Sequence, residues 1–115
     1  MKRDWDTIRT VLIAIEDDNY DEYLEESENQ EVTIKNTALL IQAGFIDGKI
    51  LNSVDMNADV LVNDLTWQGH ELLDTIRSKP VWDKIKSTAL DKGIELTFDT
   101  VRAIGAKVIE LMIGN

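Results

Sequence analysis

Residues 39–48 read LLIQAGFIDG and mark the point where a helix gives way to a β-hairpin. Gly44 follows a run of helix-forming residues, in the position of a left-handed C-terminal cap. Beyond it, residues 48–54 and 59–63 are rich in β-branched side chains, and Asp55-Met56-Asn57 between them has the chemistry of a turn. The stretch therefore predicts a helix that leads directly into a two-stranded hairpin.

Two helices are expected before the hairpin. The first is capped by Asp4 and runs to about Glu16, because its apolar residues are spaced three, four and three apart and share one face: Trp5, Ile8, Leu12 and Ile15. The second ends at Gly44, and its start has two readings. A capping box at Ser27 fits one start, and a plain N-cap at Thr33 fits the other.

Three helices are expected after the hairpin. Thr66 caps a helix over residues 67–77, and Pro80 stands in the first turn of the next helix. Gly93 ends that helix, and Thr97 caps the last one. The fold class is therefore mainly α with a small β-hairpin (α+β).

The order of these elements resembles a winged helix-turn-helix core, in which the hairpin is the wing. A chain of 115 residues is expected to form one domain, residues 1–115. Its winged-helix-like core spans about residues 4–77, and residues 78–115 form a C-terminal helical extension.

Three segments resemble one family more closely than winged helices in general. They are residues 1–16 (MKRDWDTIRTVLIAIE), residues 39–48, and residues 65–86 (LTWQGHELLDTIRSKPVWDKIK). The family consists of small uncharacterised proteins of bacteria and their prophages, catalogued as domain of unknown function 2513. Its members often carry a Tyr-His pair in the second helix, where this chain has Lys35-Asn36-Thr37. The resemblance implies a winged-helix-like fold and a prophage context, and it implies no activity.

Charge is the most unusual bulk property, with a net charge of −10. Between Glu16 and Glu31 the chain has nine carboxylates and no Lys or Arg. We read this stretch as a loop with a short helical piece. A run of like charge is typical of a solvated face, and the alternative is a surface for a basic partner.

Several classes of function are excluded. Without cysteine there is no disulfide framework, thiolate nucleophile or cysteine–zinc site. The paired carboxylates of the acidic run lack apolar surroundings, and no phosphate-binding, dinucleotide-binding or nucleophile-elbow motif is present. The N-terminus has no secretory signal, and the apolar runs are too short to span a bilayer. We expect a cytoplasmic protein that is not an enzyme, with no cofactor, metal site or membrane partner.

The single histidine and the tryptophans have structural interpretations. His70 shares a helix side with Asp74, and such a pair is mostly structural. Trp5, Trp67 and Trp82 each open a helix beside apolar positions, so we expect all three to pack into the core.

The helix in the recognition position carries polar side chains able to bond base edges or a partner: Thr33, Lys35, Asn36, Thr37 and Gln42. Lys49 adds a second cation on the wing. A specific DNA-binding protein neutralises several phosphates, and two cations beside nine carboxylates do not. We therefore predict weak binding to duplex DNA.

Three functions stay open at this stage. The first is a non-catalytic interaction module that contacts a phage or host protein. The second is a weak or partner-assisted DNA-binding transcriptional regulator, which the fold favours. The third is an acidic DNA mimic, a decoy that occupies the cleft of a DNA-binding protein.

The last helix has more apolar surface than one stripe. Val101, Ile104, Val108 and Leu111 form one face, and Ile109, Met112 and Ile113 fall beside it. Two possibilities are open for what covers this second face. A second copy of the chain would make a homodimer, with Gly105 and Ala106 allowing close approach, or Val81, Ile85 and Ala89 of the preceding helix cover the face within the chain.

Overall fold

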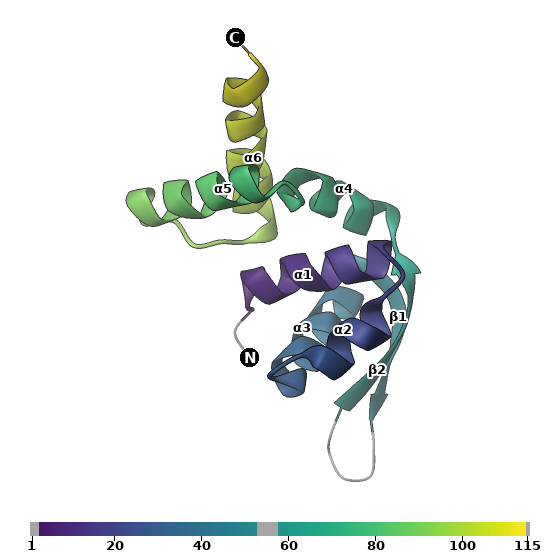
Figure 1. Ribbon diagram of the computed structural model, residues 1–115. Coiled ribbons are helices and arrows are strands. Elements are labelled where there is room, and N and C mark those ends of the chain that lie inside the picture. Colours follow the sequence, from purple (N-terminus) through teal and green to yellow (C-terminus); the bar gives the residue numbers. More distant parts are fainter. Residues whose placement is uncertain (1–2, 53–57, 115) are drawn as a thin grey trace. The chain divides into compact units, whose positions relative to one another are not determined.

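The computed structural model of the protein describes residues 3–52 and 58–114 and forms two compact units, Met1–Glu71 and Leu72–Asn115 (Figure 1). Each unit is described by itself. The prediction of one domain with a core of residues 4–77 stays a prediction. The fold class is confirmed, since the described residues are mainly helical with one antiparallel hairpin.

Unit 1 begins with three helices: α1 (Trp5–Glu16), α2 (Tyr20–Glu26) and α3 (Gln30–Gln42). The Asp4 side chain caps α1 by accepting a hydrogen bond from the Thr7 backbone N–H, as expected. Both predicted starts of α3 are wrong, because the Asn29 side chain is its cap and accepts from the Val32 N–H. The short helical piece of the acidic run is α2.

The hairpin consists of β1 (Ile46–Asn52) and β2 (Ala58–Leu65), paired antiparallel with an irregularity between Asp47 and Gly48. Both strands are longer than predicted at their outer ends, and the predicted turn at residues 55–57 lies outside the described residues. Helices α1 and α3 pack on the hairpin, and α2 packs on α1 and α3 (Figure 1). The core between these layers holds the buried side chains Ile8, Val11, Leu12, Leu40, Ile46, Val60 and Leu65.

The end of α3, the start of β1 and the start of α4 (Trp67–Ile76) meet in a closely packed junction. Gly44 has the predicted left-handed conformation, with φ of 85°. Its carbonyl oxygen accepts a 2.6 Å hydrogen bond from the Thr66 hydroxyl, which in turn accepts from the Gly69 N–H. A Cβ on Gly69 would lie 2.0 Å from the carbonyl oxygen of Phe45, so no larger residue fits there without a backbone shift.

Unit 2 contains the end of α4, α5 (Lys79–Lys92) and α6 (Phe98–Ile113), and α5 crosses and packs on α6 (Figure 1). The predicted ends are confirmed: Gly93 is left-handed at φ 65°, and Thr97 forms a capping box. Gly105 is a point of close approach, since a Cβ there would meet the Thr75 side chain at 2.4 Å. Among the described residues, no helix is long and apolar enough to cross a membrane.

Replacing Gly69 with alanine tests the junction. Alanine gains about 1 kcal/mol of helix propensity over glycine, but the clash with Phe45 outweighs that gain. We expect Gly69→Ala to lower the free energy of unfolding by about 1–3 kcal/mol, measured by urea denaturation. Gln68→Ala, an exposed neighbour in the same turn, should change it by no more than about 0.5 kcal/mol. A Gly69→Ala protein as stable as the wild type would contradict the close approach.

Candidate interaction surfaces

The nine carboxylates of residues 16–31 are all exposed, and we call them the acidic surface. They lie at the end of α1, along α2 and at the start of α3: Glu16, Asp17, Asp18, Asp21, Glu22, Glu25, Glu26, Glu28 and Glu31. No Lys or Arg occurs between residues 10 and 34. Residues 1–71 contain five basic and sixteen acidic side chains, a net charge of −11, whereas residues 72–115 contain seven and six, a net charge of +1. The net negative charge of the protein thus comes from unit 1.

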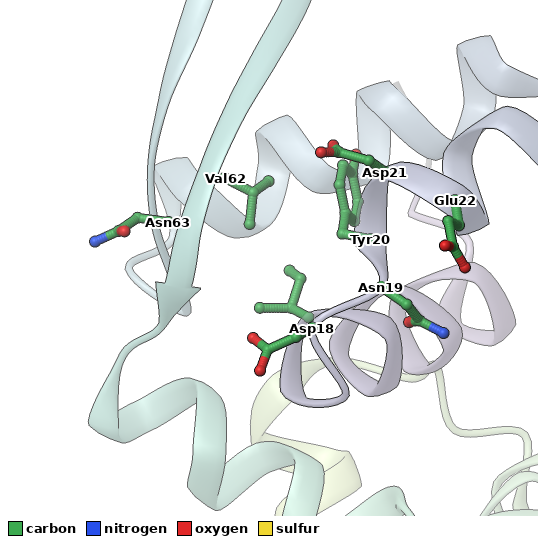
Figure 2. Close-up of a pocket in the computed structure, with 8 residues that line it drawn as sticks. Asp18, Asn19, Tyr20, Asp21, Glu22, Val62 and Asn63 are labelled. Carbon is green, nitrogen blue, oxygen red and sulfur yellow. The ribbon is translucent and has the colours of Figure 1, made fainter.

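An open depression of about 340 Å³ lies between the α1–α2 connection and β2, beside the acidic surface (Figure 2). Asp21 and Glu22 on its rim point away from each other, and Asp18 stands on the connection below them. Within the described part of the chain, no group of three or more acidic or histidine side chains is placed to hold a metal ion. The rim of the depression therefore presents separate charges to solvent.

Tyr20 lines this depression (Figure 2), and its hydroxyl group is hydrogen-bonded inside the unit. It forms a buried 2.8 Å hydrogen bond with the Thr37 hydroxyl. Burial raises the pKa of Tyr20 above the usual value of 10.0, although the bond to Thr37 acts in the opposite direction. Tyr20 thus stays protonated at neutral pH and serves as a buried structural contact.

Three of the residues predicted to contact DNA or a partner are buried: Thr33, Asn36 and Thr37. The Asn36 side-chain oxygen accepts a 2.9 Å hydrogen bond from the Asp4 N–H, and its amide group donates to the Val32 carbonyl. The prediction of surface contacts is wrong for these three. Their polar atoms find partners inside the unit, so this side of α3 faces α1 and α2.

The other three predicted contact residues, Lys35, Gln42 and Lys49, are exposed. Lys35 forms a 2.8 Å ion pair with Glu31 one turn earlier on α3. The hydrogen bond and charge of Lys35 hold the pKa of Glu31 below its usual value. The one cation on this helix is therefore partly neutralised before any phosphate approaches.

Trp67 is 78% exposed at the start of α4, so the prediction that it packs into the core is wrong. Its indole N–H donates a 2.7 Å hydrogen bond to the Glu71 carboxylate. Trp82 does pack into the core, with 1% of its surface exposed. The sequence contained a signal for this difference: Trp82 is followed three residues later by Ile85, whereas Trp67 is followed by His70. Apolar spacing therefore continues from Trp82 and stops at Trp67.

His70 meets a different carboxylate from the one predicted. Its Nδ1 atom lies 3.6 Å from a carboxylate oxygen of Glu16, at the end of α1. Both side chains are partly exposed. The contact places the first turn of α4 beside the first residue of the acidic surface.

The three residues predicted to form a dimer interface lie at the end of α6. Ile109 is half-buried, whereas Met112 and Ile113 are exposed, Ile113 to 79%. A Cβ atom at Gly105 would meet side chains of the same chain, Thr75 and Ile85. In the preceding helix Val81, Ile85 and Ala89 are buried. Ile109 is thus partly covered within the chain, whereas the last two residues of α6 are exposed to solvent. The dimer stays a prediction.

The fold and these surfaces define a class of protein: an α+β chain in which helices cover a β-hairpin and carry an acidic surface. A sequence profile described as hypothetical protein (DUF2513) matches residues 2–95. A protein of Haemophilus influenzae (strain Rd), described as an uncharacterized protein, is 33% identical, and the alignment covers 99% of this chain and all of that protein. No solved structure matches. The chain belongs to the DUF2513 family.

Replacing Asn36 tests its internal role. Asn36→Ala leaves the Asp4 N–H without its partner, so we expect the free energy of unfolding to fall by about 1–3 kcal/mol in urea denaturation. Gln42→Ala, an exposed position at the other end of α3, should change it by about 0.5 kcal/mol at most. An Asn36→Ala protein as stable as the wild type would contradict a stabilising role for the hydrogen bonds of Asn36.

Self-association through α6 is tested by light scattering. We expect the wild type to form a dimer at high concentration, because an exposed apolar patch usually marks an interface. A Met112→Glu, Ile113→Glu double variant should remain folded by circular dichroism and be a monomer, since both side chains are exposed. A wild type that is a monomer at high concentration would contradict this prediction.

Proposed function

We propose that this protein is a cytoplasmic, non-catalytic, winged-helix-like interaction module whose acidic surface binds a basic surface of a phage or host protein. The observation that carries the proposal is the set of nine exposed carboxylates, uninterrupted by Lys or Arg from residue 10 to residue 34. Such a surface attracts a cationic partner over a distance of about 8 Å at physiological salt, which is the Debye length. Electrostatic steering of this kind raises association rates by about 10- to 1000-fold.

The residues of α3 support a protein partner over DNA. Base reading needs exposed hydrogen-bonding groups together with cations that neutralise phosphates. Asn36 and Thr37 are buried, and Lys35 is paired with Glu31. Duplex DNA would also meet the net charge of −11 of unit 1. The pairing of Lys35 with Glu31 and the net negative charge of unit 1 both oppose binding to a polyanion.

The regulator alternative has one supporting observation. Lys49 is exposed on β1 of the hairpin, the element that corresponds to a wing. A DNA-binding role would then require a second protein to supply the missing cations. The decoy alternative shares its chemistry with the proposal, because a DNA-binding cleft is one kind of basic protein surface.

Neutralising α2 tests the proposal. The test variant is Asp21→Asn, Glu22→Gln, Glu25→Gln and Glu26→Gln, and the probe is a hexa-arginine peptide measured by calorimetry in 20 and 150 mM NaCl. We expect binding to the wild type to weaken with salt and to fall by on the order of tenfold in the variant, since exposed ion pairs contribute about 0.2–1 kcal/mol each.

The matched control removes the same number of charges from unit 2 at exposed positions: Asp91→Asn, Glu95→Gln, Asp99→Asn and Glu110→Gln. It should bind the peptide like the wild type at 150 mM NaCl. Equal weakening in both variants would mean that net charge alone acts, and the surface would lose its role. Tighter binding of a 20-base-pair DNA duplex than of the peptide would favour the regulator.

A further inference from the structure

We infer that Trp67 is the anchor of this interaction and receives an arginine or lysine side chain of the basic partner, with the cation on the indole face beside the Glu71 carboxylate. The inference rests on the proposed function and identifies the residue that gives it short-range specificity. Its starting point is the 78% exposure of the Trp67 side chain. Tryptophan is among the residues that dominate binding energy at protein interfaces.

Trp67 is held in position before any partner binds. The Thr66 hydroxyl ties the first turn of α4 to the Gly44 carbonyl at 2.6 Å, and the Thr66 N–H donates to the Phe45 carbonyl at 3.1 Å. The indole N–H donates to Glu71 at 2.7 Å, which restrains the orientation of the ring. A side chain restrained in this way loses less conformational freedom when a partner binds.

The chemistry around the ring fits a cation. The ten residues of α4 include Glu71 and Asp74 and no Lys or Arg. Tryptophan has the strongest attraction for a cation among the aromatic side chains, and a neighbouring carboxylate adds a hydrogen-bond acceptor. The same chain uses this contact internally, where the Lys86 amino group lies 5.4 Å from the centre of the Trp82 ring. At Trp67 the residue in the corresponding position one turn later, Glu71, is a carboxylate, and we assign the cation to the partner.

The anchor adjoins the acidic surface within unit 1. His70 lies one turn after Trp67 on the same side of α4, and its Nδ1 atom is 3.6 Å from Glu16. Glu16 is the first residue of the acidic surface. A basic partner attracted by that surface therefore reaches Trp67 as part of the same contact, whereas a nucleobase would bring phosphates against the carboxylates.

The test is a nuclear magnetic resonance titration of the ¹⁵N-labelled full chain with the hexa-arginine peptide. The Trp67 indole N–H signal is identified by its absence in Trp67→Leu, a variant expected to fold because the side chain is exposed. We expect this signal to shift along with the backbone amides of residues 20–26, with one dissociation constant for both. Trp67→Leu should weaken binding by about three- to thirtyfold, and Trp67→Phe by less.

Leu90→Ala, at an 81% exposed position on α5, is the matched control and should bind like the wild type. If residues 20–26 shift while the indole signal does not, or if Trp67→Leu binds as tightly as the wild type, the anchor is overturned and the acidic surface keeps its role. If no signal moves, the anchor and the proposed function both fail.

Discussion

The carbonyl oxygen of Phe45 approaches the Cα atom of Gly69 so closely that only a hydrogen atom fits on that side of α4. This contact links the end of α3, the first strand and the start of α4, which are far apart in sequence. The Thr66 hydroxyl reinforces it by bonding to the Gly44 carbonyl and capping α4. This junction holds the first turn of α4 against the start of the hairpin, and this turn carries the exposed Trp67 and the His70 side chain that contacts Glu16.

A second constraint is the polar layer between α1, α2 and α3. Asn36 binds the first turn of α1 through the Asp4 N–H, and Thr37 binds α2 through the Tyr20 hydroxyl. Buried polar groups stabilise only the arrangement that satisfies them, so this layer specifies how the three helices meet. It also removes from the surface the groups that a DNA-reading helix would present. The packing of unit 1 and the burial of Thr33, Asn36 and Thr37 therefore have the same origin.

The helix ends and the α+β class could be predicted because caps are local chemistry. Asp4, Thr97, Gly44 and Gly93 act at the predicted ends, since each needs only its own helix. The start of α3 could not be resolved because several capping residues compete before it, and Asn29 is the one used. The burial of Asn36 depends on Asp4, 32 residues away, which no local pattern indicates. The exposure of the acidic run could therefore be expected from its charge, whereas the burial of Asn36 could not be expected from its neighbours in sequence.

Charge and shape have different parts in the proposed interaction. Unit 1 has a net charge of −11 and unit 2 of +1, so the long-range field that attracts a cationic partner originates in unit 1. Such a field acts mainly on the rate of encounter, and salt screens it beyond about 8 Å. The lifetime of a complex depends on short-range contacts, which account for most differences in affinity between related partners. Carboxylates alone would hold any basic protein equally well. Selectivity then requires a fixed apolar group at the edge of the charge, and Trp67, restrained by Glu71 and by the junction beneath it, meets that requirement in unit 1.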